Sequence, residues 1–409
     1  MASTVSPLGF REVLQNTAVK RLWFAQVISI FGDFLAIFAI FSVVTFQLHG
    51  TPVQVAMVLI SFLTPLAIFS PVAGVYVDKW NVKAVMVASD LLRGALVLVL
   101  IFVRDLNVIY GTLFAMSFVS SFFMPAQAIA VKTLAPEGGL LSVNALMTQA
   151  YYGGQIIAPS VSGALVDLAG ANTCFALDVI SFLASAALVA SLTIRRHTSG
   201  ASQNTASVLS SLRQGLSFIF THPSISFIMI SLACGMFAVR CFGSLLSLWV
   251  RDVLLSTART FGVLNTLIGL GMITGAQMVR KAAAKLPPER LVTFALSGMG
   301  LAVAITAAFG ELISTIVGML LLGFCAAFIT ITSQTLTQQE TPPEMLGRVS
   351  SSMMSMMAVS QVISMVVAGP VAERVGLRNL YYASAVLLAV VGVTGYMQLR
   401  KRHFRAAAA

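Results

Sequence analysis

Twelve long apolar segments, six on each side of a basic, serine-rich stretch at residues 195–213, constrain the fold of this chain more than any other feature. A helix of about 20 apolar residues spans the ~30 Å hydrocarbon core of a bilayer and satisfies all of its own backbone polar groups. The segments lie at 21–48, 53–76, 84–103, 107–131, 144–166, 172–194, 223–249, 260–280, 291–309, 312–337, 349–370 and 379–399. The sequence therefore predicts an all-α membrane protein with 12 transmembrane helices.

The composition excludes a large soluble domain. Apolar residues make up 58% of the chain and charged residues 10%, whereas about a quarter of the residues in a soluble protein are charged. The mean hydropathy is +0.92. The sequence has no G-x-x-x-x-G-K-S/T motif, so the chain has no ATP-driven motor of its own. We expect a membrane protein that is not an enzyme and that needs no bound cofactor.

Residues that bind metals are sparse in the membrane segments. The four cysteines fall within apolar segments at spacings that match neither a zinc site nor a disulfide framework. The four histidines lie at segment ends or in loops. We therefore expect no metal site.

The distribution of positive charge indicates the topology. The net charge is +11, and with the N-terminus inside, most Lys and Arg residues fall in cytoplasmic loops. The exceptions in outside loops are Arg104, Arg251, Arg259, Arg374 and Arg378. Cytoplasmic loops of membrane proteins carry an excess of Lys and Arg. The sequence thus predicts a multi-pass membrane protein with both termini in the cytoplasm, and no nucleic-acid partner.

The two halves of the chain are related at an offset of about 206 residues. The sequence GALVDLAG at 163–170 aligns with GPVAERVG at 369–376, and Pro136 aligns with Pro342. Because six is an even number, both halves enter the membrane from the same side, and they form parallel repeats. We expect an N-terminal six-helix bundle at 1–194, a cytoplasmic linker at 195–221 and a C-terminal six-helix bundle at 222–409.

Asp33 is the first candidate for a transport residue. It lies near the middle of the first apolar segment, with no cation within one helical turn. An acid at this depth pairs with a base, binds a cation or takes up a proton, because burial disfavours the charged carboxylate. The structural alternative is an aspartate that is permanently hydrogen-bonded to neighbouring helices.

Arg240 is the candidate partner of Asp33. It lies in the seventh segment, which is the repeat equivalent of the first, within one position of the residue that aligns with Asp33. We hypothesise that the two side chains form a pair that protonation of Asp33 opens. Arg240 could instead bind an acidic substrate group, or extend toward the outer interface.

The tenth and eleventh segments carry candidate cavity residues. Thr330, Gln334 and Gln338 recur at i, i+4 and i+8, which places them on one helix face. Met354, Met357 and Gln361 belong to a methionine-rich stretch, and flexible methionines suit bulky apolar ligands. The alternative is that these methionines fill the core or face lipid.

Asp90 and Arg93 place opposite charges at i and i+3 on one face of the third segment. We expect them to pair, because an isolated charge at this depth costs several kcal/mol. The pair is either part of a gate or a purely structural ion pair.

The loop after the second segment resembles the signature loop of the major facilitator superfamily. Its sequence, GVYVDKWNVK at 74–83, matches G-x-x-x-D-R/K-x-G-R-K/R except at Asn81 and Val82. In that superfamily the loop latches the cytoplasmic ends of the two bundles. The resemblance implies the major facilitator fold and gating roles for Gly74, Asp78, Lys79 and Lys83. Asp90 and Arg93 lie near this loop, and we expect them to belong to the same gating network. The alternative for the loop is a solvated turn.

The fifth segment is similar to the antiporter motif of the same superfamily, G-x-x-x-G-P-x-x-G-G. Gly154, Ala158, Pro159 and Gly163 carry the match, with small residues in place of some of the glycines. The resemblance implies export in exchange for protons. Close helix packing through small residues is the competing explanation.

Short sequences at 29–33, 88–93 and 122–127 resemble one exporter branch of the superfamily, which includes macrolide efflux proteins, the enterobactin exporter and the lysophospholipid transporter. We therefore expect a monomeric secondary transporter that exports amphipathic or lipophilic compounds, such as drugs or siderophores, by proton antiport. The main alternative is a lysophospholipid transporter. A ferroportin-like metal exporter is a minor alternative, since ferroportins share the Gly-Asp of the first helix. A receptor or scaffold that does not transport is disfavoured because no sizeable soluble domain is present.

Overall fold

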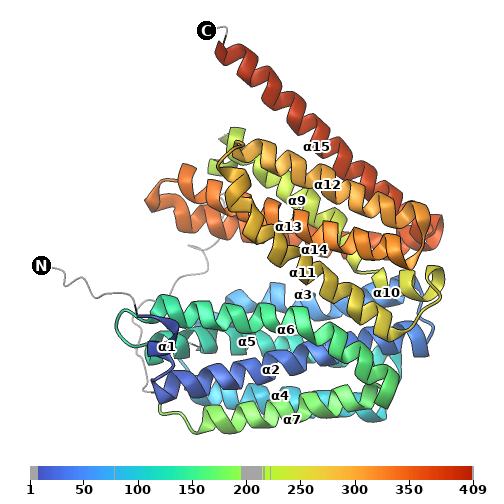
Figure 1. Cartoon of the computed structure of the whole chain (residues 1–409). Helices are drawn as coiled ribbons and strands as arrows, with labels where there is room; N and C mark the ends of the chain where they lie inside the picture. The colour runs from blue at the N-terminus through green and yellow to red at the C-terminus, as the bar shows by residue number, and fades with distance from the viewer. Residues whose placement is uncertain (1–7, 78, 195–213, 215–216, 222, 408–409) are drawn as a thin grey trace, which may run out of the picture. The chain divides into compact units, whose positions relative to one another are not determined.

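The computed structural model describes residues 8–77, 79–194, 214, 217–221 and 223–407. In these ranges all regular secondary structure is helical (Figure 1). A short helix α1 (Phe10–Val13) precedes the long ones. The long helices of the first half are α2 (Thr17–Ser42), α3 (Pro52–Val77), α4 (Val82–Phe102), α5 (Leu106–Leu134), α6 (Leu140–Ala169) and α7 (Ala171–Ala190). Those of the second half are α9 (Pro223–Gly243), α11 (Ala258–Ala283), α12 (Pro288–Phe309), α13 (Leu312–Glu340), α14 (Pro343–Val375) and α15 (Leu377–Ala407).

The predicted segments are all present, with two differences. The seventh segment is not one helix, since α9 ends at Gly243 and is followed by α10 (Leu246–Leu248) and a π-helical turn at Trp249–Val253. Eleven spans in the described ranges are long and apolar enough to cross a membrane, and α6 is not among them. The first half of α6 is the more polar part, with Asn144 and Gln149. The chain is nevertheless an all-α membrane protein in which α6 supplies the twelfth long helix.

Helix ends follow the local sequence. Asn16 caps α2 by accepting from the backbone N–H of Ala18 at 2.9 Å. Asp105 caps α5 by accepting from the N–H groups of Asn107 at 2.9 Å and Val108 at 3.2 Å. Asn and Asp are favoured at these positions because the side-chain oxygen satisfies N–H groups that have no partner within the helix.

The internal repeat is confirmed by backbone conformations that recur at the same offset. Gly170 ends α6 with φ +83°, and Gly376 ends α14 with φ +85°. Only glycine adopts such angles without strain. The π-helical turns at Val43–Gln47 and Trp249–Val253 are equivalent in the two halves. They are followed by His49 and Leu255, which both have φ +48°.

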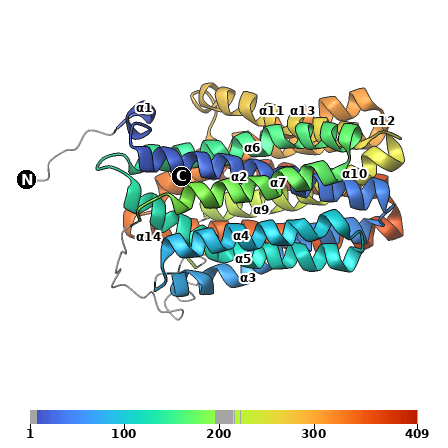
Figure 2. The ribbon, with the colours of Figure 1, turned by 90° about the horizontal axis from the view of Figure 1, so that it is seen from below.

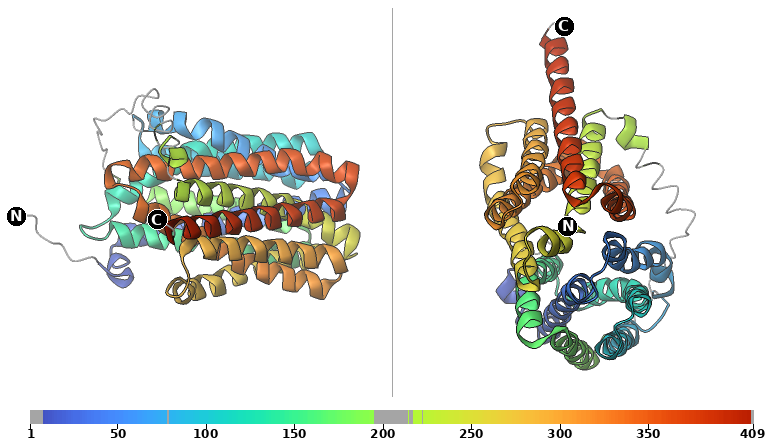
Figure 3. Two further views of the ribbon diagram at one scale, coloured as in Figure 1. Left: turned by 90° about the horizontal axis from the view of Figure 1, so that it is seen from above. Right: turned by 90° about the vertical axis from the view of Figure 1, so that its right-hand side faces the viewer.

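The helices form two compact units, one of residues 1–49, 57–202 and 257–263 and the other of residues 50–56, 203–256 and 264–409. Most of the predicted linker at 195–221 lies outside the described residues. In the first unit α2 packs against α6 and α7, and α4 packs against α5 and α7. These helices run side by side (Figure 2) and are seen end-on in the right-hand view of Figure 3. In the second unit the equivalent pairs are in contact, since α9 packs against α14 and α15, and α12 packs against α13 and α15.

Candidate functional site

Asp33 lies on α2 and contacts an arginine of another helix of the same unit. Its Oδ2 is 3.4 Å from Nη1 of Arg93 on α4. The Asp33 side chain is 34% exposed, whereas the Arg93 side chain is 5% exposed. The carboxyl group of Asp33 is therefore accessible, while its cationic partner is held inside the unit.

Arg93 is fixed by groups on three helices. Its Nη2 is 2.5 Å from Oδ1 of Asp90, and the other oxygen of that carboxylate accepts a hydrogen bond of 2.7 Å from Ser185 Oγ on α7. The guanidinium lies 4.4 Å from the ring centre of Phe123 on α5 and 4.5 Å from that of Phe182 on α7. Aromatic ring faces at these distances attract a guanidinium group through cation–π interactions. Arg93 is thus positioned by charge and by packing together.

Gly32 brings α2 close to a second buried acid on α7. A Cβ atom on Gly32 would lie 2.5 Å from Oδ1 of Asp178, and it would also collide with Oγ of Ser181. Asp178 is 0% exposed. Ser181 Oγ donates to Oδ1 of Asp178 at 3.1 Å and to its backbone carbonyl at 2.8 Å. Asp33, Asp90, Arg93 and Asp178 form what we call the charge cluster.

The charge cluster contains three carboxyl groups and one guanidinium group. With all four groups ionised it would hold an excess of negative charge inside an apolar unit. Like charges repel strongly when they lie close together in a medium of low dielectric constant. The single guanidinium group can balance the charge of only one of the three carboxylates. Among the described residues, no group of three or more His, Cys, Asp or Glu side chains is arranged to hold a metal ion.

The sequence analysis found three of these four residues. The Asp90–Arg93 ion pair that the i, i+3 spacing predicts is present. The contact between Arg93 and Asp33 was not predicted, because spacing along one helix does not identify a neighbour from another. Asp178 was missed, although the signal that selected Asp33 applies to it as well. It too is an acid within an apolar segment with no cation within a turn.

Arg240 lies on α9 in the other unit, and its side chain is half-buried. The proposed pair of Arg240 with Asp33 would join the two units, and it stays a prediction. Within the first unit, the cation in contact with Asp33 is Arg93.

The predicted polar stripe of α13 is exposed to different extents. Thr330 is half-buried, and Gln334 and Gln338 are exposed. On α14, Met357 and Gln361 are half-buried, and the side chain of Met354 lies outside the described part of the chain. The roles of these residues in a substrate cavity stay predictions.

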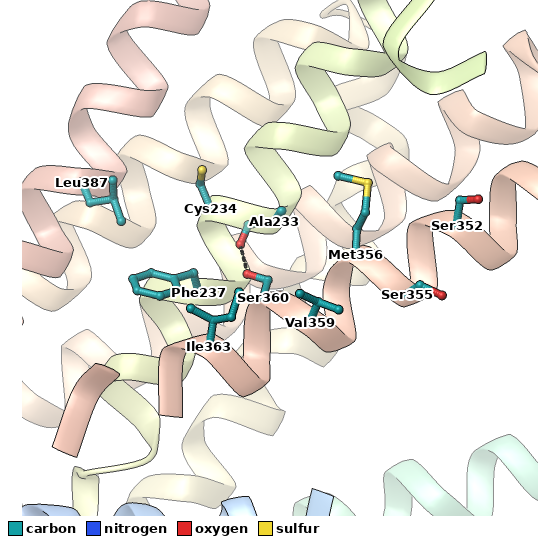
Figure 4. A pocket seen from close by; sticks show the side chains of 10 residues that line it. All are labelled: Ala233, Cys234, Phe237, Ser352, Ser355, Met356, Val359, Ser360, Ile363 and Leu387. Carbon is teal, nitrogen blue, oxygen red and sulfur yellow. Dashed lines mark hydrogen bonds between the residues drawn. The ribbon is translucent and has the colours of Figure 1, made fainter. Parts of the chain in front are cut away.

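A pocket of about 460 Å³ lies within the second unit, between α9, α14 and α15 (Figure 4). It is lined by Ala233, Cys234, Phe237, Ser352, Ser355, Met356, Val359, Ser360, Ile363 and Leu387. The hydroxyl group of Ser360 is satisfied within the protein, because it donates to the carbonyl of Ala233 at 2.6 Å. The lining carries no charged side chain. Met356, from the methionine-rich stretch of the eleventh segment, is one of the lining residues. Such a pocket suits an uncharged apolar group.

The predicted gate lies only partly within the described residues. Asp78 is outside them. Lys79 is exposed in the turn between α3 and α4, and Lys83 is half-buried in the first turn of α4. A Cβ atom on Gly74 would meet nothing within 4 Å. Close packing therefore does not require glycine at this position.

The antiporter-like motif on α6 forms a packed helix face. Ala158, Pro159 and Gly163 are buried, and a Cβ atom on Gly154 would lie 3.1 Å from Ile30 of α2. Ser162, within the same motif, donates a hydrogen bond of 2.9 Å to the carbonyl of Leu35 on α2. These contacts support the packing explanation, and the role in proton exchange stays a prediction.

We expect Gly32→Ala to lower the free energy of unfolding by about 1–3 kcal/mol, because the added methyl group overpacks the contact with Asp178 and Ser181. Gly111→Ala on α5 is the matched control, since a Cβ atom there meets nothing within 4 Å. It should be neutral or stabilising by up to about 1 kcal/mol, because alanine favours helices more than glycine does. Thermal unfolding of the two purified variants in detergent measures the difference. Equal stability of Gly32→Ala and the parent protein would contradict the close contact of α2 with α7.

The chain resembles transport proteins along most of its length. It is 25% identical over 383 residues to the uncharacterized MFS-type transporter YfiS of Bacillus subtilis (strain 168), covering 90% of each chain. It is 22% identical over 391 residues to macrolide efflux protein A of Streptococcus pyogenes, covering 93% of this chain and 96% of the relative. Among solved structures, that of the nucleoside transporter NupG superposes with a TM-score of 0.73 at 14% identity, covering 93% of this chain and 99% of the other. At that identity the structural likeness supports the fold alone.

The family model of the Major Facilitator Superfamily matches residues 22–365, which is most of the chain. The match agrees with the twelve long helices and with the repeat described above. The chain therefore belongs to the Major Facilitator Superfamily of membrane transporters.

Proposed function

We propose that this transporter exports amphipathic or lipophilic small molecules and takes up protons in exchange. The observation that carries the proposal is the charge cluster, in which an accessible acid contacts a buried arginine. In a membrane segment a carboxyl group in such a position can bind and release a proton.

Protonation of Asp33 would change the interactions of Arg93. An ionised Asp33 attracts Nη1 of Arg93 across 3.4 Å, and a neutral Asp33 attracts it less. Arg93 would then be held by Asp90 and by the rings of Phe123 and Phe182. The contact between α2 and α4 thus depends on a proton, and a contact of this kind can bias the equilibrium between two conformations.

The pocket in the second unit supports an amphipathic or lipophilic substrate. Its volume of about 460 Å³ falls within the range of ~300–1,000 Å³ that is typical of small-molecule sites. None of its lining residues carries a charge. The resemblance to macrolide efflux protein A also favours export of a large, mostly apolar compound.

The remaining roles follow from this proposal. Asp78, Lys79 and Lys83 would gate the cytoplasmic side. Both termini would lie in the cytoplasm of a bacterial inner membrane, and the transporter would act as a monomer with the proton as its coupling ion. Gln334, Gln338, Thr330, Met354, Met357 and Gln361 would contribute to the substrate path.

Proton flux in liposomes tests the proposed function. The purified protein is reconstituted with an internal pH dye, and macrolides, catecholate siderophores, lysophospholipids and lipophilic cations are added in turn. We expect a change of internal pH with at least one class in protein-containing liposomes and not in protein-free ones. No change with any class, together with movement of a labelled lysophospholipid, would replace proton antiport with lipid transport.

A further inference from the structure

We propose that Asp178 is a second proton-binding group of the charge cluster, that it is uncharged at neutral pH in the arrangement seen here, and that its ionisation is coupled to that of Asp33. The proposal builds on the proposed function, because it adds a second acid to the site that would couple protons to transport.

Asp178 is buried without adequate partners for a negative charge. It is 0% exposed, and within the described part of the chain its Oδ2 has no hydrogen-bond partner. Its Oδ1 accepts from Ser181 Oγ at 3.1 Å, but the single hydroxyl hydrogen is shared with the closer backbone carbonyl at 2.8 Å. A buried carboxylate that lacks both a cation in contact and full hydrogen bonding is costly, and protonation removes that cost.

Asp90 provides the comparison within the same unit. It is equally buried, but both of its oxygens have strong partners, Arg93 Nη2 at 2.5 Å and Ser185 Oγ at 2.7 Å. The positive charge of Arg93 is therefore engaged by Asp90, and at 3.4 Å by Asp33. The cluster can stabilise the negative charge of Asp90, and it has no comparable contact for Asp178.

Asp33 is the group through which Asp178 would act on transport. Asp33 follows Gly32 on α2, and Asp90 and Arg93 of α4 contact Ser185 and Phe182 of α7. Cys174 lies one turn before Asp178 on α7. Gly32, next to Asp33 in the chain, places the backbone of α2 against the Asp178 carboxyl group. Negative charges on Asp33 and Asp178 repel each other, so each acid holds its proton more tightly when the other is ionised.

Infrared spectroscopy of the reconstituted full-length protein tests the proposal, because a protonated carboxyl group has a C=O stretching band that is distinct from those of carboxylates. We expect the parent protein to show such a band at neutral pH. Asp178→Asn should lose the band, while Asp33→Asn and the surface control Asp105→Asn should keep it. On raising the pH, the band should disappear at a lower pH in Asp33→Asn than in the parent protein. The negative charge that opposed ionisation of Asp178 is absent from that variant.

Two results would overturn the proposal. A parent protein without the band at neutral pH, or with a band that Asp178→Asn leaves in place, would mean that Asp178 is ionised. The same pH dependence in Asp33→Asn and the parent protein would mean that the two acids are not coupled. The comparison of Asp33→Asn with the parent protein keeps residue 178 unchanged. It therefore tests the coupling of the two acids even when Asp178→Asn does not fold. The spectra need no substrate, so failure of the liposome assay alone would contradict the proposed function and not the state of Asp178.

Discussion

Asp33→Asn is expected to reduce substrate-driven proton flux by roughly 10-fold or more, because an amide can neither bind nor release the proton that a membrane carboxyl group carries. The fold should persist. The Asp33 side chain is 34% exposed, and its partner Arg93 keeps the closer contact with Asp90 at 2.5 Å. The asparagine carbonyl can still accept from Arg93. Proton flux is measured in liposomes with an internal pH dye, and exchange of labelled substrate across the same membranes, without a pH gradient, is measured in parallel.

Asp105→Asn is the matched control for this variant. It makes the same chemical change at an exposed position, and asparagine caps a helix about as well as aspartate does. We expect proton flux close to that of the parent protein. The expected pattern for Asp33→Asn is lost proton flux with retained substrate exchange. Unchanged proton flux in Asp33→Asn would remove this residue from the coupling mechanism.

The sequence was sufficient to predict the helices and the repeat, because both depend on local properties. Apolar length decides where a helix crosses a bilayer. The glycines at 170 and 376 align in the sequence, and the structure gives them the same positive φ. The break after Gly243 was not predicted, since the apolar run continues through it.

The charge cluster was harder to predict because it depends on which helices are neighbours. Asp90 and Arg93 share one helix, so their spacing indicates a pair. Arg93 meets Asp33 only because α7 packs against both α2 and α4, and no pattern within one segment contains that information. The repeat instead suggested Arg240 as the partner of Asp33, because the two residues lie at nearly equivalent positions in the two halves. Asp178 could have been found from the sequence alone, because, like Asp33, it is an acid within an apolar segment with no cation within one helical turn.

Arg93→Met is expected to lower the free energy of unfolding by about 3–5 kcal/mol, which is the typical cost of removing one partner of a buried ion pair. Asp90 is 0% exposed and would retain Ser185 Oγ at 2.7 Å but no cation in contact. Methionine can still contact the rings of Phe123 and Phe182, because its thioether packs well against aromatic rings. The decrease in the free energy of unfolding would therefore reflect the lost charge of Arg93 more than its lost side-chain volume. Thermal and denaturant unfolding in detergent measure it.

A second substitution separates the uncompensated charge from other effects of losing Arg93. Adding Asp90→Asn to Arg93→Met removes the buried charge that the single variant leaves behind, so the double variant should be more stable than Arg93→Met alone. Coupling between neighbouring groups of this kind is usually about 0.5–3 kcal/mol. Arg21→Met is the control. Within the described part of the chain, this exposed arginine makes long contacts to Ser191, at 3.3 and 3.5 Å. A double variant no more stable than Arg93→Met would mean that Arg93 stabilises the unit by packing against the rings of Phe123 and Phe182. Protonation of Asp33 would then not act through the charge of Arg93.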